Sequence, residues 1–176
     1  MAFEDPAPAY IESDVKTVFT PAIANISAPT VAELTAAAAT ELSKWIVADG
    51  WKPTRSQDFV DHAVEGVGSV GKIPGRKSFD NTEVQIYDNV NGGETTPNVA
   101  AETLTEGKEG YFVRRRSTAV AASSPFKAGD VVSVYRVTIG AKDPVAHSGN
   151  DLMQSVVSFG IDPDSVVETA IVATGE

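Results

Sequence analysis

The chain has 176 residues, enough for one domain with a sizeable core, and we expect a single domain over residues 1–176. Its 14 Lys and Arg residues against 24 Asp and Glu residues give a formal net charge of −10, which argues against a protein that grips nucleic acid through a basic face. The absence of cysteine excludes disulfides, Cys-based metal sites and a Cys nucleophile.

Residues 1–13 are expected to form an extended N-terminal arm, because Pro6 and Pro8 disfavour a helix. The arm lacks the basic and apolar regions of a secretion signal, and no apolar run in the chain approaches membrane-spanning length. We therefore expect a soluble protein without a cleaved signal and without a membrane anchor.

In the first half of the chain, residues 55–65 fit either a helix, with Phe59, Val60, Ala63 and Val64 on one face, or a strand, with Val60, His62 and Val64 on one face, and a strand is favoured. Alternation of apolar and polar residues predicts further strands over 14–20, 42–48 and 78–88. A turn at Asp49-Gly50 is expected to end the second of these strands. Thr30 and Glu33 have capping-box spacing and predict a short helix over 31–38. The Gly-rich residues 66–77 are expected to be a flexible loop that joins strands 55–65 and 78–88 into a long hairpin.

In the second half, Thr96 as N-cap and Pro97 at the first helical position predict a short helix over 96–104. Strands are expected over 111–116, 129–141, 155–161 and 165–172. Residues 131–139 are apolar on both faces of their strand, which is typical of a strand between two layers or against another subunit. The predicted fold class is all-β, a β-sandwich or barrel with one or two short helices.

Two sequence motifs resemble enzyme motifs, but their context does not support the chemistry. Residues 66–71 match GxGxxG, yet Pro74 leaves no room for the helix that a dinucleotide site needs, so a hairpin loop is the better interpretation. Ser124 and Lys127 match SxxK, with Ser148-Gly-Asn150 beyond, but the chain is too short for the scaffold of penicillin-binding enzymes.

Metal-binding patterns are equally weak. His62 and His147 lie far apart in the sequence, although Asp58 would share a face with His62, and a metal site needs three or four convergent ligands. The oxygen-rich stretch 88–94 departs from EF-hand spacing and is better explained as a turn stabilised by Asx side chains. We expect no catalytic residue, no cofactor and no metal.

The run 114–116 is the only basic cluster in the sequence. Successive strand residues point to opposite faces, so these arginines cannot form one phosphate-binding patch. In so acidic a chain we expect them to form salt bridges with a neighbouring copy, and the predicted inter-subunit residues are Arg114, Arg115, Arg116 and Arg136.

Several stretches, in this order, resemble the major tail tube proteins of long-tailed phages, especially those that infect actinobacteria. They are KTVFTPAIANISAPTVAELTAA, DGWKP, VGKIPGRKSFD, LTEGKEGYFVRRR and KAGDVVSVYRVTIG, and the similarity extends over roughly residues 14–172. In particular, helix 96–104 with the following EGKEGYFV resembles the family's flanking helix and next strand, and Ala128-Gly129-Asp130 resembles the turn into its central strand. Arg136 stands where members often have Pro.

The resemblance implies a β-sandwich whose long hairpins combine in a hexameric ring into an inner barrel. Rings would stack into a tube through which the genome passes without specific DNA binding, and the partners would be copies of this chain with tape measure, tail terminator and distal tail proteins. An alternative class is a sandwich-type binding module, such as a virion decoration or adhesin domain. An enzyme would need a deep pocket with converging polar groups.

If residues 57–65 and 83–87 are the two arms of the inner hairpin, alternation predicts which side chains face the channel. These are Asp61 and Glu65 on the first arm and Glu83 and Gln85 on the second. An acidic lumen is favoured because each Lys or Arg contact to phosphate adds affinity and would hold back a sliding duplex.

Overall fold

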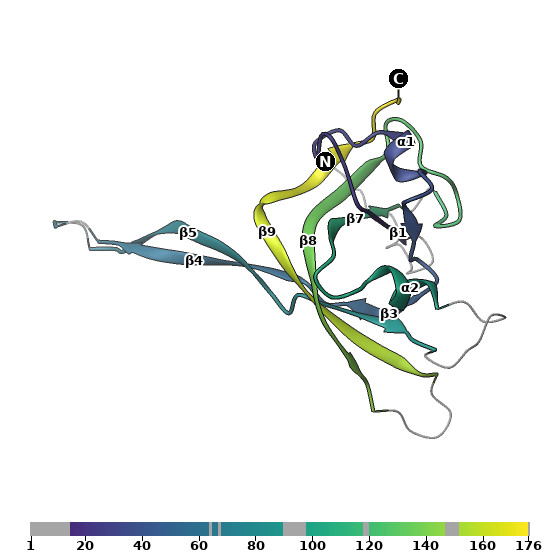
Figure 1. Ribbon diagram of the computed structural model, residues 1–176. Helices are drawn as coiled ribbons and strands as arrows, with labels where there is room; N and C mark the ends of the chain where they lie inside the picture. Colours follow the sequence, from purple (N-terminus) through teal and green to yellow (C-terminus); the bar gives the residue numbers. More distant parts are fainter. Residues whose placement is uncertain are drawn as a thin grey trace, which may run out of the picture.

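A computed structural model describes residues 15–63, 65–66, 68–89, 98–117, 120–146 and 152–175 (Figure 1). The elements in chain order are β1 (Val15–Thr20), α1 (Val31–Leu34), β2 (Thr40–Glu41), β3 (Ile46–Trp51), β4 (Thr54–His62), β5 (Gly71–Asp80), β6 (Glu83–Tyr87), α2 (Val99–Thr103), β7 (Glu109–Arg116), β8 (Val131–Pro144) and β9 (Gln154–Ile171). The prediction of an all-β fold with short helices is confirmed. The expected N-terminal arm lies outside the described residues.

Seven strands form one curled antiparallel sheet in the order β2-β1-β7-β8-β9-β6-β3, and β4 and β5 form a separate hairpin. Although β2 and β3 lie at opposite edges of the sheet, only residues 42–45 connect them. That link spans at most about 18 Å, whereas a flat seven-stranded sheet is about 29 Å across. The sheet must therefore curl into a half-barrel.

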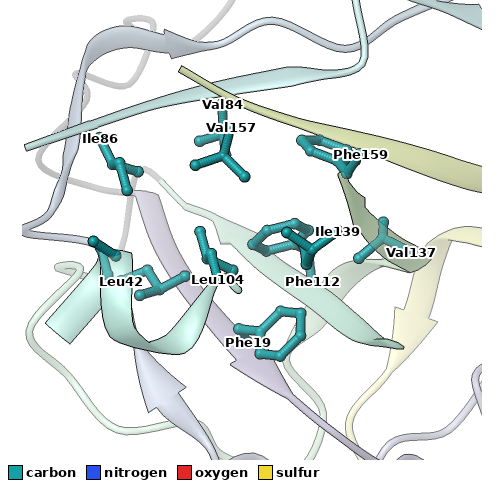
Figure 2. Packing of buried hydrophobic residues seen from close by; sticks show 12 residues of the cluster. Phe19, Leu42, Val84, Ile86, Leu104, Phe112, Val137, Ile139, Val157 and Phe159 are labelled. Carbon is teal, nitrogen blue, oxygen red and sulfur yellow. The ribbon is translucent and has the colours of Figure 1, made fainter. Parts of the chain in front are cut away.

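The curl encloses the first of two apolar cores (Figure 2). Phe112 lies at its centre, with the Phe19, Phe159 and Trp51 rings at centroid distances of 5.2 to 5.3 Å. Leu104 after α2 and Leu42 in the β2–β3 link close this core. Edge-to-face and tilted ring pairs of this kind add stabilisation beyond the area that they bury.

A second core lies on the other face of β1 and β7, under α1, with Leu34, Val113 and Phe126 among its members. Strand β8 contributes to both cores, since Val132 and Val134 lie in the second and Val137 and Ile139 in the first. The apolar residues on both faces of this strand are therefore explained by two layers within one subunit.

The capping box predicted before α1 is present. Thr30 Oγ1 accepts a hydrogen bond from the Glu33 amide at 3.2 Å, and the Glu33 carboxylate accepts one from the Thr30 amide at 2.7 Å. Partial burial acts to raise the pKa of Glu33, but hydrogen bonds from the Ala24 and Thr30 amides and from the Thr30 hydroxyl outweigh it and lower the pKa. The helix ends at Leu34, four residues before the predicted end.

The predicted strand 42–48 is wrong in position. Residues 42–45 form the turn that joins the sheet edges, and β3 begins at Ile46 and continues through Asp49-Gly50 to Trp51. Asp49 has a positive φ of 57°, and the pairing of β3 with β6 shifts register here. A bulge takes the place of the expected turn because Asp tolerates the left-handed region.

The hairpin also differs from the prediction. Its second arm is β5, which pairs with β4 from Thr54↔Asp80 to His62↔Gly71, so the expected flexible loop 66–77 is strand from Gly71 onwards. Asn81, with φ of 50°, separates β5 from β6, and β6 belongs to the main sheet between β3 and β9. The predicted strand 78–88 is thus two strands, and residues 83–87 are not a hairpin arm.

The two strands predicted over 155–161 and 165–172 are one strand, β9. Pro163, in the gap between the two predicted strands, cannot donate a hydrogen bond to a neighbouring strand, yet the strand continues through it. The sheet tolerates an irregularity, because Val137 pairs with Ile161 and Tyr135 with Val166, which leaves the intervening β9 residues looped out. The second helix, α2, has Asn98 as its N-cap, and the predicted cap residues Thr96 and Pro97 lie outside the described residues.

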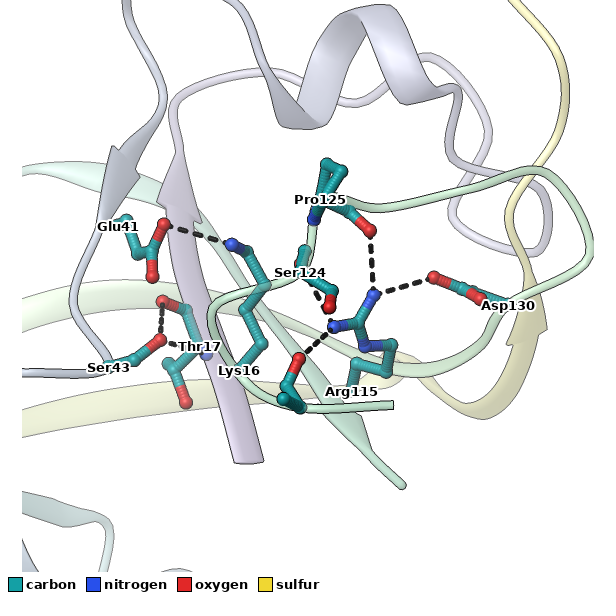
Figure 3. A network of polar contacts seen from close by, with 9 residues as sticks. Lys16, Thr17, Glu41, Ser43, Arg115, Ser124, Pro125 and Asp130 are labelled. Atoms are coloured by element: carbon teal, nitrogen blue, oxygen red, sulfur yellow. Dashed lines mark hydrogen bonds and ion pairs between the residues drawn. The ribbon is translucent and has the colours of Figure 1, made fainter. Parts of the chain in front are cut away.

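Arg115 organises the loop between β7 and β8 (Figure 3). Its side chain is 2% exposed, and its guanidinium donates to Asp130 Oδ2 at 2.8 Å and to the carbonyl oxygens of Ala121, Ser124 and Pro125 at 3.0 Å. Arg115 Nε has no hydrogen-bond partner among the described residues. These contacts lie within one subunit, whereas Arg115 was predicted to contact a neighbouring copy.

Asp88 ties the end of β6 to three other segments. Its carboxylate accepts hydrogen bonds from Asn98 Nδ2 and Ser155 Oγ, both at 2.7 Å, and forms an ion pair with Lys142 Nζ at 3.0 Å. Burial acts to raise the pKa of Asp88, but hydrogen bonds from Asn98, Ser155 and Lys142, together with the positive charge of Lys142, outweigh it and lower the pKa. The charged form is therefore the one that the fold stabilises.

Asp88→Asn should remove a pH-dependent part of the stability. Because the pKa of Asp88 is lowered in the folded state, its contribution is fully present above the unfolded pKa of about 3.9 and is lost as the pH falls through the folded pKa. The free energy of unfolding of the variant, measured by urea titration, should be lower than that of the wild type at pH 6, and the difference should narrow progressively as the pH falls below about 4. As a control, Asp143→Asn removes the same charge at an exposed position. If the difference in free energy of unfolding between wild type and Asp88→Asn stayed constant at all pH values, the role given to the Asp88 charge would be contradicted.

Arg115→Met should lower the free energy of unfolding by about 3 to 5 kcal/mol, because it leaves Asp130 and three carbonyl oxygens without their buried donor. For a chain of this size the loss lowers Tm by roughly 6 to 20 °C. Arg116→Met, at the next and exposed position, should change the free energy of unfolding by less than about 0.5 kcal/mol. Equal Tm values for the two variants would show that the loop does not depend on Arg115.

Candidate functional site: exposed assembly surfaces

The β4–β5 hairpin projects from the body of the subunit (Figure 1). It exposes large apolar side chains. Phe59 is 58% exposed, Val60 60% and Ile73 50%. Phe59 pairs with Pro74, and Val60 with Ile73, and consecutive pairs face opposite sides of a ribbon. Both faces of the hairpin are therefore apolar, which is typical of a surface that another molecule covers.

The base of the hairpin is fixed to the main sheet by polar and aromatic contacts. Arg55 Nη1 lies 3.2 Å from Glu168 Oε2 on β9, and its guanidinium lies 5.2 Å from the centre of the Phe79 ring. The Phe79 ring in turn contacts Tyr135 on β8 at a centroid distance of 6.4 Å. These contacts set the direction in which the hairpin leaves the body.

Two further apolar pairs are exposed on the long strands or near their ends. Val131, at the start of β8, pairs with Ile171, at the end of β9, and they are 54% and 57% exposed. Leu152 and Met153 precede β9 and are 67% and 55% exposed. The subunit thus presents uncovered apolar side chains on the projecting hairpin and at both ends of β9.

The four predicted lumen residues do not lie on one element. Asp61 is on β4, where Lys72 Nζ lies 4.0 Å from its Oδ1, and both side chains are 69% exposed. Glu65 is exposed in the turn of the hairpin. Glu83 and Gln85 are on β6, opposite in alternation to the buried Val84 and Ile86. Gln85 is half-buried and its Nε2 donates to Gln154 Oε1.

The arginine cluster divides between the two faces of β7, as its alternation predicted. Arg114 stacks on Trp51, with its guanidinium carbon 4.3 Å from the ring centre, and Arg116 is exposed on the same side. Arg115 points into the opposite core. Arg136 is 48% exposed and lies between Glu109 and Asp162 of its own subunit, at 3.7 and 3.8 Å.

The enzyme-like and metal-like motifs are parts of ordinary structure. His62 is exposed at the end of β4, Gly66 lies in a turn with φ of 87°, and Gly71 opens a strand where a nucleotide site needs a helix. Within the described ranges, no three His, Cys, Asp or Glu side chains gather as metal ligands, and no helix is long and apolar enough to cross a membrane. His147 lies outside those ranges.

Sequence reasoning missed the residues that make the hairpin a surface. Phe59 and Val60 were interpreted only as evidence for helix or strand. Two adjacent apolar residues in a strand necessarily point to opposite faces, so their occurrence next to a polar, Gly-rich stretch was the available signal.

A model of the phage tail tube protein family matches residues 8–174. No curated protein matches the chain. Among solved structures, a chain of the 6-fold symmetrised anti-feeding prophage (AFP) baseplate is similar with a TM-score of 0.51 and 8% identity, covering 99% of this chain and 100% of that one. A chain of an extracellular contractile injection system, from the PVC sheath/tube terminator in the extended state, has a TM-score of 0.49 and 13% identity, covering 96% and 100%.

At 8% identity, the similarity to the baseplate chain shows a shared fold and nothing more. The match to the family model extends over nearly the whole sequence. It agrees with the curled sheet and the projecting apolar hairpin of this subunit. The chain belongs to the phage tail tube protein family and is a structural component of the virion tail.

Proposed function

We propose that copies of this chain assemble into hexameric rings, and that the rings stack into the tail tube of a long-tailed, siphovirus-type phage through which the genome is delivered. The observation that carries this proposal is the β4–β5 hairpin, which exposes apolar side chains on both faces. A neighbouring copy on each side of the hairpin would bury both faces. A closed ring would also remove the free edges of the sheet, which otherwise invite open-ended pairing.

The remaining partners follow from the same role. The tube would contact tape measure, tail terminator and distal tail proteins, and it would assemble in the host cytoplasm before it becomes part of the virion. The role is structural, without catalysis and without a cofactor. Family membership favours this function over a decoration or adhesin module.

The lumen surface proposed here includes Asp61, Glu65, Glu83 and Gln85. Glu65 and Glu83 are exposed, and neither forms an ion pair with another residue of the described ranges. Asp61 is opposed by Lys72, so its charge is partly compensated. A net charge of −10 per copy supports a channel that repels the duplex. Arg114, Arg116 and Arg136 remain candidates for contacts between copies.

Replacing the apolar side chains of the hairpin should prevent assembly without unfolding the subunit. In Phe59→Ser/Ile73→Ser, both changed side chains are at least half exposed, so Tm should change little while the yield of tubes, counted by negative-stain electron microscopy, should fall at least tenfold. Phe59→Tyr/Ile73→Val keeps apolar surface at both positions and should still assemble. Normal tubes from the serine variant would place the interface elsewhere.

Reversing the charge of the proposed lumen should affect genome delivery more than assembly. Asp61→Lys/Glu65→Lys/Glu83→Lys should still form tails, but the added cations would hold the phosphates of the duplex and slow its passage. Potassium efflux and phage DNA entry report delivery, and tail length in micrographs reports assembly. Glu102→Lys/Glu106→Lys/Asp143→Lys makes the same change of net charge at other exposed positions. Equal delivery by both triple variants would show that the first three residues do not line the channel.

A further inference from the structure

A cleft with a volume of about 280 Å³ lies between the β1–β7 end of the sheet and strand β3. Its apolar walls are Val15, Ile46, Val47 and Trp51, and all four side chains are partly exposed. Val15 pairs with Arg116, so the cleft lies where β1 begins and β7 ends. A groove with such walls accommodates apolar or aromatic side chains.

Two guanidinium groups line the same cleft. Arg114 is held in place by Trp51, on which it stacks, and by Thr17 Oγ1, to which its Nε donates at 3.2 Å. Arg116 is exposed, and no ion pair joins it to the residues that the structure describes. Asp49 offsets one positive charge at the cleft, which leaves a net charge of +1. The cleft is therefore suited to a segment that combines apolar side chains with carboxylates.

A second cleft of about 310 Å³ under α1 is a weaker candidate for such a segment. Its cation, Lys16, already lies 2.9 Å from Glu41 Oε2 and is 8% exposed. A carboxylate arriving there would meet a neutralised charge. The comparison favours the cleft at Arg116.

Residues 1–14 have the matching chemistry. Their sequence, MAFEDPAPAYIESD, contains four carboxylate side chains, no Lys or Arg, and the apolar or aromatic Phe3, Tyr10 and Ile11. Pro6 and Pro8 disfavour a helix, and a polyproline-like stretch of this length spans about 40 Å. The side chains of this segment therefore carry only negative charge, whereas the cleft has a net positive charge.

We infer that the Arg116 cleft of one copy binds residues 1–14 of a second copy. Val15, which directly follows this segment, is itself a wall of the cleft. To occupy the cleft of its own chain, the segment would have to reverse direction in the few residues just before Val15. An extended segment instead reaches well beyond its own cleft, to a neighbouring subunit. The inference rests on the proposed self-assembly, to which it adds a specific contact between copies.

The test uses a fluorescent synthetic peptide of residues 1–14 and the full-length protein at a dilution where light scattering shows monomers. Fluorescence anisotropy should report saturable binding that weakens as salt is raised. Arg116→Glu should weaken binding at least tenfold. Lys77→Glu makes the same charge change on the hairpin, away from the cleft, and should bind like the wild type. A peptide with Glu4, Asp5, Glu12 and Asp14 replaced by Lys should lose binding to the wild type.

Unchanged binding to Arg116→Glu would overturn the inference, and so would an absence of binding to correctly folded wild-type protein. The second result would also follow if the chain's own segment filled the cleft. Electron microscopy separates this inference from the proposed function, because wild-type tubes without peptide binding would contradict only the contact described here. A wild-type protein that binds the peptide but never forms tubes would contradict only the tube.

Discussion

The short connection between β2 and β3 constrains the whole subunit. Four residues join opposite edges of a seven-stranded sheet, and the sheet has to curl so that these edges approach each other. Leu42 within the connection is fully buried, and its amide donates to the Thr17 carbonyl of β1 at 2.9 Å. The curl brings Trp51 of β3 against Phe112 of β7, so that the aromatic core forms between strands that are far apart in the sheet order.

Three charged groups are buried among the described residues, and each is paired: Arg115, Asp88 and Lys16, the last with Glu41. Arg115 holds the loop before β8 through Asp130 and three carbonyl oxygens, and Asp88 joins β6 to β8, β9 and the start of α2. A buried charge without partners would cost several kcal/mol, so such groups persist where their hydrogen bonds are satisfied. The two networks lie beside different cores. The Arg115 network fixes the β7–β8 loop, and the Asp88 network fixes the end of β6.

The two cores cover both faces of β1 and β7 except where these strands line the cleft at Arg116, so the described residues leave little apolar surface uncovered. That uncovered surface consists of the hairpin, the ends of β9 and the cleft at Arg116. The hairpin is a continuation of the β3–β6 pair that leaves the barrel, and only its base contacts β8 and β9. This fold combines a body that has its own apolar cores with a projecting hairpin whose apolar side chains no other described residue covers. That division of roles suits a protein built for repetition in a tube.

The sequence by itself determined the fold class, most strands and the capping box of α1, because alternation, β-branched residues and the Thr30–Glu33 spacing act over a few residues. It also determined that Arg114 and Arg116 share a face opposite Arg115. Only the tertiary structure decided that Arg115 is buried, that Asp49 forms a bulge and that β9 continues through Pro163. It also showed that β6, predicted as part of the hairpin, belongs to the main sheet. These features depend on pairing between segments distant in the chain, where the partner strand supplies or removes hydrogen bonds that local propensity cannot register.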